Sequence, residues 1–254
     1  FNAPVVGNNG PICEGSTLNL TATTIAGATY QWSGPNGFTS NDQNPVITNA
    51  VAAASGTYSL AVTLNGCTSQ LQNTVATVNP TPVTPVVGND GPVCVGDILN
   101  LTASTIIGAT YTWTGPNGYS STTQNPIITS ATATHTGTFN VTANVNGCVS
   151  AIGSTAVVVN DLPVSTFSPL TGTMGFNVTF TPVVSGASYS WSFASGNPSS
   201  STDENPIVLW SSTGTYTTQL TVSQNGCSSS TNSQIIISNP TIQTFNHTGS
   251  PQTF

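Results

Sequence analysis

The sequence predicts an all-β protein made of three tandem β-sandwiches in an elongated rod. Three observations support this prediction. Apolar and polar residues alternate with a period of two, which is typical of half-buried strands. A block of roughly 80 residues recurs along the chain, and Gly and Pro turns bound its short apolar stretches. About seven short strands in each block are typical of a two-sheet sandwich.

The recurring block is clearest in its first two copies, which align without a gap. The segment YQWSGPNGF begins at Tyr30, and YTWTGPNGY begins 81 residues later at Tyr111. A more divergent third copy carries YSWSF from Tyr189. Short Pro-containing stretches separate the copies and predict semi-rigid linkers. The predicted divisions are residues 1–82, 83–163 and 164–240 for the three sandwiches, and 241–254 for a C-terminal tail.

One strand is especially clear in every copy. Tyr58, Leu60 and Val62 alternate with small or polar residues in the stretch 56–64, and equivalent stretches begin at Gly137 and Gly214. Each stretch ends in an Asn-Gly pair, which is the preferred pair for a two-residue type I′ hairpin turn. No segment shows a convincing helical period. The pattern therefore predicts strands and hairpins throughout.

Further markers are typical of an immunoglobulin-like sandwich. Trp32, Trp113 and Trp191 occupy the place of the core tryptophan on the third strand. The Gly-Thr-Tyr or Gly-Thr-Phe sequence that opens the clear strand resembles a tyrosine corner. Leu60 stands where antibody domains place a cysteine, so the core disulfide of those domains is absent.

The charged residues are all acidic. The 254 residues include no lysine or arginine and seven Asp and Glu, which gives a formal net charge of −7. This composition excludes a P-loop lysine, a lysine Schiff base and cleavage by trypsin-like proteases. The negative charge argues against binding of nucleic acid or anionic membranes. The longest apolar run, residues 156–159, is far too short for membrane insertion.

The five cysteines recur at equal spacings. Cys13 and Cys67 are 54 residues apart, and so are Cys94 and Cys148. This spacing predicts two disulfides, each within one repeat, and an oxidising, extracellular compartment. A zinc site is the alternative, but it requires close ligand pairs such as C-x-x-C, which are absent. Cys227 lacks a partner in its own repeat; we expect a buried free thiol, with a bond to another chain as the alternative.

These motifs together resemble a known group of repeats. The pattern C-x-G…Y-x-W-x-G-P-N-G-[FY]…Q-N-P…G-T-[YF]…N-G-C is similar to the immunoglobulin-like and PKD-like repeats of secreted or surface proteins of Bacteroidetes-type bacteria. In the third copy, Trp191-Ser192-Phe193 is similar to the start of the PKD motif W-x-F-G-D-G, although Ala194 and Ser195 replace its Gly-Asp. The resemblance covers residues 3 to about 239. It implies an extracellular stalk, adhesive or interaction module, and it does not imply catalysis.

No residue pattern predicts an enzyme, a metal site or a cofactor. His135 lies in a turn that lacks histidine in the other copies, so we expect a solvated turn residue rather than a catalytic base. Asp203 and Glu204 are adjacent in a predicted loop. Weak calcium binding is the alternative to a solvated pair, but it requires six or more oxygen ligands.

Glycans enter the interpretation in two ways. Phe38 and Tyr119 in the GPNG loops are candidate sugar-stacking residues, and they also fit a packed loop. Asn-x-Thr sequons are candidate glycan attachment sites, although chance explains them in a chain so rich in Asn and Thr. The sequons are Asn19, Asn100, Asn140, Asn177 and Asn246, the first four of which lie on predicted strands.

The tail beyond the third copy has two interpretations. It is either a linker or a connector in which Ile242, Phe245 and Phe254 contact another subunit. A head-to-tail contact that does not close generates a filament. The sequence therefore predicts a non-enzymatic structural protein that self-associates into an extracellular filament or surface stalk, secreted after removal of a signal peptide. The alternative is an adhesin or carbohydrate-binding module of a larger secreted protein, with a surface glycan or a host or cell-surface ligand as its partner.

Overall fold

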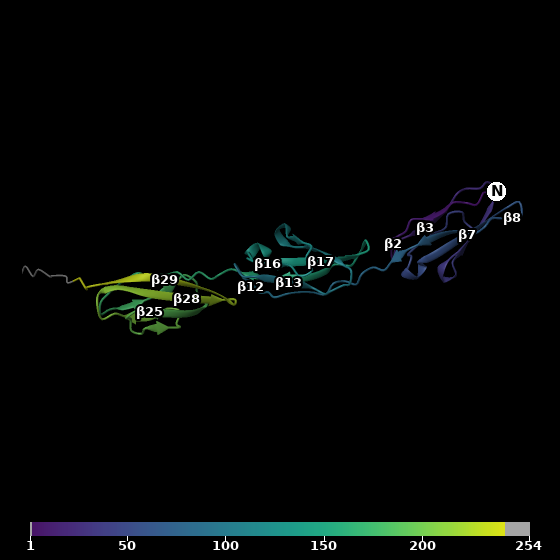
Figure 1. Cartoon of the computed structure of the whole chain (residues 1–254). Helices are drawn as coiled ribbons and strands as arrows, with labels where there is room; N and C mark the ends of the chain where they lie inside the picture. Colours follow the sequence, from purple (N-terminus) through teal and green to yellow (C-terminus); the bar gives the residue numbers. More distant parts are fainter. Residues whose placement is uncertain (1, 242–254) are drawn as a thin grey trace, which may run out of the picture. The chain divides into compact units, whose positions relative to one another are not determined.

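The computed structural model describes residues 2–241, and this part of the chain is all-β, as predicted (Figure 1). Short 3-10 helices are its only helical elements. Contacts group these residues into two compact units, and the boundary between them passes through the second repeat. Among the described residues, the first unit contains 2–90, 100–127 and 136–157, and the second contains 91–99, 128–135 and 158–241.

The first repeat lies wholly in the first unit and forms two main sheets. One sheet has the order β1-β3-β6, and the other has the order β5-β4-β7-β8 with β9 also paired to β7. Strands β2 and β10 form a separate parallel pair. The bounds are β1 Val6–Asn8, β2 Ile12–Cys13, β3 Leu18–Ala22, β4 Thr29–Ser33, β5 Thr39–Ser40, β6 Val46–Ile47, β7 Gly56–Leu64, β8 Cys67–Thr68, β9 Gln72–Ala76 and β10 Val78–Asn79, with η1 Pro35–Gly37 and η2 Ala52–Ala54.

The core of the first repeat comes from alternate residues of these strands. Leu18 and Leu20 of β3 pack with Trp32 of β4 and with Tyr58 and Leu60 of β7, and all five are fully buried. The period of two in the sequence thus marks the inward face of each strand, as predicted. Burial of these apolar side chains is the main source of stability. Ion pairs of lysine and arginine contribute nothing, because both residues are absent from the sequence.

The strands of the second repeat pair in the same way. The orders are β11-β13-β16 and β15-β14-β17-β18, with β19 on β17, and a parallel pair β12-β20. The bounds are β11 Val87–Asn89, β12 Val93–Cys94, β13 Leu99–Ala103, β14 Thr110–Thr114, β15 Ser120–Ser121, β16 Ile127–Ile128, β17 Gly137–Val145, β18 Cys148–Val149, β19 Gly153–Val157 and β20 Val159–Asn160, with η3 Pro116–Gly118 and η4 Ala133–His135.

The third repeat lies in the second unit and has a longer central hairpin. Its largest sheet has the order β22-β29-β28-β25-β26, and β21-β24 and β23-β27 form further pairs. Its core is rich in aromatic residues, including Phe180, Trp191 and Trp210. The bounds are β21 Phe167–Ser168, β22 Thr171–Thr173, β23 Asn177–Thr179, β24 Thr181–Pro182, β25 Ser188–Phe193, β26 Ser200–Ser201, β27 Ile207–Leu209, β28 Gly214–Gln224 and β29 Cys227–Ser238.

The Asn-Gly pairs form the predicted hairpin turns. Asn65 and Gly66 have φ of 50° and 80°, and the pairs at 146–147 and 225–226 have nearly the same values. Both central residues of a type I′ turn require positive φ, which Asn and Gly tolerate best. Each turn carries a cysteine immediately after it, at Cys67, Cys148 and Cys227.

The predicted tyrosine corner forms in the first and third repeats. The hydroxyl of Tyr58 donates a hydrogen bond to the carbonyl oxygen of Ala54 at 2.8 Å. The hydroxyl of Tyr216 donates a hydrogen bond to the backbone carbonyl oxygen of Ser212 at 3.1 Å. Phe139 occupies the equivalent place in the second repeat and is fully buried, but it has no hydroxyl. The corner therefore contributes packing in all three repeats and a hydrogen bond in only two.

Candidate functional site

The disulfides join successive repeats, which corrects the predicted pairing. Cys13 bonds Cys148 and Cys94 bonds Cys227, with Cα–Cα distances of 5.6 and 5.7 Å. Cys67, predicted to be bonded, is an exposed free thiol. Cys227, predicted to be free, is bonded and buried. Two disulfides are present, as predicted, but neither lies within one repeat.

Strand β7 explains why Cys13 does not bond Cys67. Cys13 pairs with Asn79, which lies three residues after Ala76, the partner of Gly56 at the start of β7. Cys67 pairs with Leu64 at the end of β7. Figure 1 shows β2 and β8 at opposite ends of the first sandwich. Nine residues of strand span roughly 27 Å, and a disulfide needs Cα atoms within about 7 Å. A disulfide between these two cysteines is therefore excluded by the fold.

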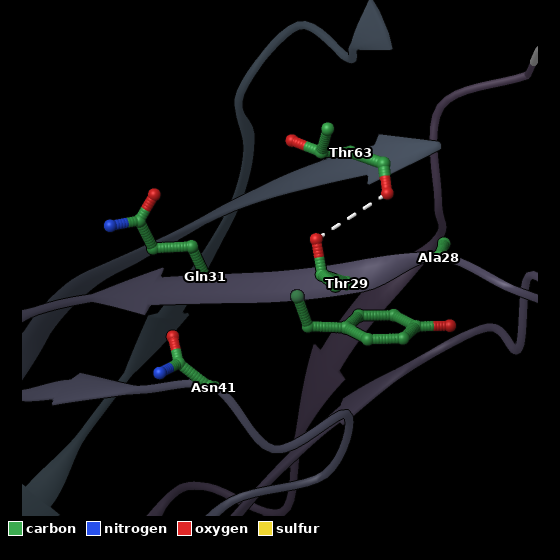
Figure 2. Close-up of a pocket in the computed structure, with 6 residues that line it drawn as sticks. Ala28, Thr29, Gln31, Asn41 and Thr63 are labelled. Carbon is green, nitrogen blue, oxygen red and sulfur yellow. Dashed lines mark hydrogen bonds between the residues drawn. The ribbon is translucent and has the colours of Figure 1, made fainter. Parts of the chain in front are cut away.

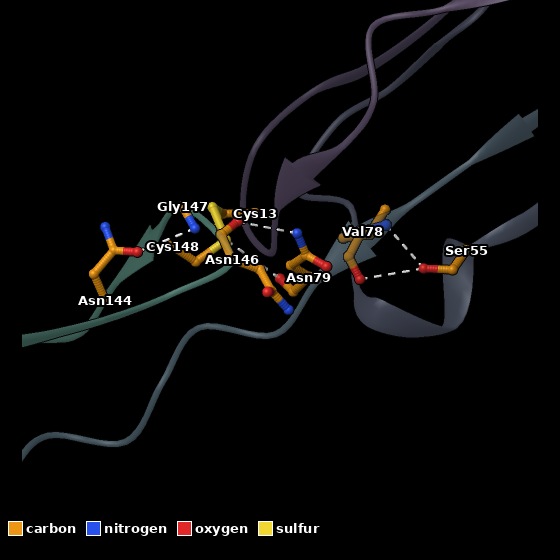
Figure 3. Close-up of a disulfide and its surroundings, with 8 residues drawn as sticks. All are labelled: Cys13, Ser55, Val78, Asn79, Asn144, Asn146, Gly147 and Cys148. Carbon is orange, nitrogen blue, oxygen red and sulfur yellow. Dashed lines mark hydrogen bonds between the residues drawn. A yellow bond between two sulfur atoms is a disulfide. The ribbon is translucent and has the colours of Figure 1, made fainter. Parts of the chain in front are cut away.

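The first junction, inside the first unit, combines the Cys13–Cys148 disulfide with a second contact (Figure 3). The side-chain amide of Asn79 donates a hydrogen bond to the carbonyl oxygen of Asn146 at 3.3 Å. Asn79 is the strand neighbour of Cys13 in the parallel β2-β10 pair. We call Cys13 and Asn79 a docking pair, and residues 146–148 a docking hairpin.

The second junction, inside the second unit, repeats this arrangement with equivalent residues. Cys94 and Asn160 form the docking pair on β12 and β20, and residues 225–227 form the docking hairpin. The amide of Asn160 donates to the carbonyl oxygen of Asn225 at 3.0 Å. The same two contacts at two places along the chain indicate one mode of joining repeats.

Hydrogen bonds hold the backbone on both sides of the first junction. In the first junction, the N–H of Gly147 donates to the side-chain oxygen of Asn144 at 3.1 Å, which holds the turn closed. Ser55 fixes the opposite side, because its hydroxyl accepts a hydrogen bond from the N–H of Val78 at 2.8 Å. The docking pair and the hairpin therefore both lie on backbone held by hydrogen bonds (Figure 3).

One feature of the sequence is consistent with disulfides between successive repeats. The third repeat retains a hairpin cysteine, Cys227, but has no cysteine in residues 171–175, where the first cysteine of a repeat is expected. A hairpin cysteine without a partner in its own repeat is accounted for when each hairpin bonds the preceding repeat. Equal spacing within a repeat does not distinguish the two pairings.

Two of the residues considered for catalysis or metal binding, His135 and Asp203, make local hydrogen bonds. The Nδ1 atom of His135 in η4 accepts a hydrogen bond from the N–H of Thr132 at 3.0 Å, so it closes a turn. A side-chain oxygen of Asp203 accepts from the Ser201 hydroxyl at 3.0 Å. Among residues 2–241, no group of three or more His, Cys, Asp and Glu side chains is arranged to hold a metal ion.

The candidate sugar-stacking residues pack inside their own repeats. Phe38 makes an edge-on contact with Tyr58, with ring centroids 5.5 Å apart, and Tyr119 makes the same contact with Phe139 at 5.2 Å. Burial raises the pKa of the Tyr58 and Tyr119 hydroxyls. Neither ring is fully exposed, so the packed-loop alternative describes both residues.

A shallow polar depression lies on the first repeat (Figure 2). Thr29, Gln31, Asn41 and Thr63 contribute polar groups to its lining, and the Thr29 hydroxyl donates to the carbonyl oxygen of Thr63 at 3.5 Å. The aromatic ring beside it, that of Tyr30, is 8% exposed. The depression therefore offers hydrogen-bonding groups without an open ring face for stacking.

The sequons divide between described and undescribed residues. The asparagines predicted to lie on strands do so, and they are Asn19 on β3, Asn100 on β13, Asn140 on β17 and Asn177 on β23. Two of their side chains are engaged: the amide of Asn100 donates to Asp90 at 2.6 Å, and the side-chain oxygen of Asn140 accepts from Ser154 at 2.7 Å. Asn246 and the predicted connector residues Ile242, Phe245 and Phe254 lie outside the described residues.

Two family models match parts of the chain. Residues 2–80 match the model described as "Ig-like domain CHU_C associated", and residues 162–237 match the PKD domain. The chain carries immunoglobulin-like and PKD domains in tandem. These assignments confirm the fold class predicted from the tryptophans, the tyrosine corner and the repeats. No curated protein matches the chain.

Solved structures of proteins with several domains in tandem are similar to the chain at low identity. The N-terminal eight Ig domains of Down Syndrome Cell Adhesion Molecule align at 15% identity and a TM-score of 0.46, covering 93% of this chain and 36% of that one. Three N-terminal domains of the bacteriophage RB49 Highly Immunogenic Outer Capsid protein align at 15% identity and a TM-score of 0.39, covering 94% and 100%. Sequence identities and TM-scores this low carry no information about function.

Across residues 2–241, no helix has the length and apolar character required to cross a membrane. The disulfides and the immunoglobulin-like domain suggest an extracellular location. Tandem immunoglobulin-like and PKD domains fit a non-enzymatic structural or adhesive role.

Proposed function

We propose that the protein is a load-bearing structural subunit of an extracellular filament or surface stalk. The observation that carries this proposal is the pair of covalent cross-links between successive repeats, Cys13–Cys148 and Cys94–Cys227. Each junction has a peptide linker, a disulfide and an Asn side-chain contact, so a repeat that unfolds stays attached to its neighbour by two covalent routes.

The two disulfides close overlapping loops, with sequence separations of 135 and 133 residues. A force applied to the chain ends passes from Cys13 to Cys148, back along the chain to Cys94, and from there to Cys227. Most residues lie outside this shortest covalent path and are protected from extension. Limited extension under tension is a useful property for a stalk or a filament.

Composition supports a role outside the cell. The chain has no bond for trypsin-like proteases, and its disulfides are stable in an oxidising environment. We propose a protein secreted to the cell surface after removal of a signal peptide and resistant to proteases. Sandwiches at residues 1–82, 83–163 and 164–240 are the repeating parts, and the tail at 241–254 is the proposed connector to another copy.

Electron microscopy and tail deletion test the proposal together. Negative-stain images of the purified full chain at increasing concentration should show filaments, and removal of residues 241–254 should abolish them. A substitution of Ile107, a residue of the second repeat that is 93% exposed, by Ser is the matched control and should leave assembly intact. Persistent monomers at high concentration, or filaments that survive the deletion, would contradict a connector in the tail.

A further inference from the structure

The Asn-Gly-Cys hairpin of the first repeat has the features of a docking hairpin but carries no partner. Residues 65–67 occupy the position that 146–148 and 225–227 occupy in the next two repeats, and their backbone has the same positive φ values. The other two hairpin cysteines are disulfide-bonded and 1% exposed, whereas Cys67 is exposed and free. Two of the three equivalent sites are thus occupied in the same way.

The occupied sites show what their partner must offer. Each partner provides a cysteine and an asparagine on adjacent parallel strands, with Cys13 opposite Asn79 and Cys94 opposite Asn160. The cysteine bonds the hairpin thiol, and the asparagine amide donates to the carbonyl oxygen of the residue two before that thiol. At the first hairpin, Asn65 supplies the equivalent carbonyl oxygen.

The third repeat of this chain does not offer a docking pair. A backbone hydrogen bond identifies the equivalent positions in the third repeat. In each docking pair, the residue after the cysteine donates its N–H to the carbonyl oxygen of the asparagine, from Glu14 to Asn79 and from Val95 to Asn160, at 2.9 Å. In the third repeat, the N–H of Met174 donates to the carbonyl oxygen of Ser238 at the same distance. Thr173 and Ser238 therefore replace the cysteine and the asparagine, and they pair in the same register. Both docking pairs in the described chain, Cys13 with Asn79 and Cys94 with Asn160, already hold a hairpin.

We infer that the hairpin at residues 65–67 is a covalent docking site for a further immunoglobulin-like repeat that presents a free docking pair. This inference deepens the proposed structural role, on which it rests, by naming the chemistry of the repeat that docks at this hairpin. The bond joins Cys67 to the cysteine of the pair, and the asparagine amide of the pair donates to the carbonyl oxygen of Asn65. A second unmodified copy of this chain is not the partner, because its docking pairs are occupied.

The bond requires an oxidant of the disulfide class. The two thiols lose two protons and two electrons as their sulfur atoms join, and the oxidant, such as oxidised glutathione, is reduced to two thiols. An exposed thiol is accessible to this exchange, and Cys67 is exposed. The docked hairpin then buries its sulfur, as at Cys148 and Cys227.

A duplication of the first repeat tests the inference in one chain. Residues 1–84 are placed before Pro4 of the full chain, so that the added copy has the linker and spacing of a natural junction. The added copy carries Cys67→Ser, so that the original Cys67 is the only thiol in peptides of that sequence. After folding in a glutathione redox buffer, peptic peptides are mapped by mass spectrometry, and thiols are labelled with maleimide. We expect a disulfide from Cys13 of the added copy to Cys67 of the original, and loss of maleimide labelling at that Cys67.

Two variants of the added copy control this experiment. Cys13→Ser should restore full labelling of the original Cys67, and Asn79→Ala should slow formation of the disulfide without preventing it. In the unmodified chain, Cys67 should be labelled under native conditions. A duplicated chain whose original Cys67 stays fully labelled, or bonds other cysteines at random, would overturn the inference.

A second arm uses the original chain and tests docking between molecules. The double substitution Thr173→Cys with Ser238→Asn gives the third repeat a free docking pair, and a concentrated sample should form a reducible ladder of disulfide-linked oligomers. Cys67→Ser in the same background should abolish the ladder. Cys67–Cys67 dimers alone would argue against specific docking. These readouts do not depend on the tail, so they are separable from the filament test.

Discussion

Cys148 in the docking hairpin of the second repeat is bonded to Cys13 of the first repeat, 135 residues earlier, with their Cα atoms 5.6 Å apart. Cys94 and Cys227 repeat this relationship at a separation of 133 residues. Each bond joins one repeat to the next, which makes the array a covalently cross-linked unit. The mechanical and thermodynamic consequences are open to measurement.

Removal of the first disulfide should destabilise the first unit. In the chain-entropy model, a closed loop of this length contributes roughly 5 kcal/mol, so Cys13→Ser with Cys148→Ser should lower the urea midpoint monitored by tryptophan fluorescence. Cys67→Ser is the control, and its exposed site should change stability by less than about 0.5 kcal/mol. Equal midpoints for the double variant and the parent would contradict the assigned pairing.

Stretching the chain between residues 2 and 241 should release much less length with the disulfides intact. The shortest covalent path includes residues 2–13, the segment from 148 back to 94, and residues 227–241. It holds roughly 80 residues and extends to ~280 Å, whereas the reduced chain extends to ~840 Å, at about 3.5 Å per residue. Single-molecule force spectroscopy with and without dithiothreitol measures the difference. Similar contour lengths in the two conditions would refute the overlapping loops.

The tyrosine corner of the first repeat should contribute measurably to stability. Tyr58 is fully buried, and its hydroxyl satisfies the carbonyl oxygen of Ala54. Tyr58→Phe leaves that oxygen without this donor and should cost about 1 kcal/mol in denaturant unfolding. Tyr216→Phe removes an exposed hydrogen bond in the third repeat and should cost less. A larger loss for Tyr216→Phe would contradict this ranking.

Stability should decline at alkaline pH partly because of Tyr58. Burial raises the pKa of its hydroxyl in the folded state, so the folded protein holds this proton more tightly than the unfolded chain. The contribution is fully present below the unfolded pKa of about 10 and is lost as the pH rises through the folded pKa. Urea midpoints between pH 7 and 11 should fall less steeply in Tyr58→Phe than in the parent or in Tyr216→Phe. Parallel curves would rule this contribution out.

Stability near neutral pH should depend little on salt. The sequence has no lysine or arginine, so salt has no ion pairs of these side chains to screen. Between 50 and 300 mM NaCl at pH 7, we expect the melting temperature to change by no more than about 2 °C. Differential scanning calorimetry measures this shift. A large salt-induced loss of melting temperature would contradict this prediction, because it would reveal a stabilising electrostatic interaction that does not involve lysine or arginine.

Local features of the fold were predictable because they depend on neighbouring residues. The Asn-Gly turns follow from the positive φ that a type I′ hairpin requires, and Asn65 and Gly66 adopt it. The alternation in residues 56–64 identifies the buried face of β7. Trp32, Trp113 and Trp191 are buried as their place in the repeat predicts.

The sequence predicted most of the bonded cysteines of the candidate site but not which cysteines pair. The sequence identified Cys13, Cys94 and Cys148 as bonded residues, and the structure pairs them differently and exchanges the roles of Cys67 and Cys227. The docking contacts of Asn79 and Asn160 have no signal in a single repeat, because their acceptors lie in the next repeat.

The sequence by itself determined the repeats, the strands, the turns and the absence of lysine and arginine, because each is a property of composition or of residues close in the chain. Only the tertiary structure decided which cysteines meet. Strand β7 holds Cys13 and Cys67 at opposite ends of one sandwich, and the hairpin of the following repeat brings Cys148 to Cys13. A disulfide depends on distance in space, and the equal spacing of 54 residues in sequence carries no information about that distance.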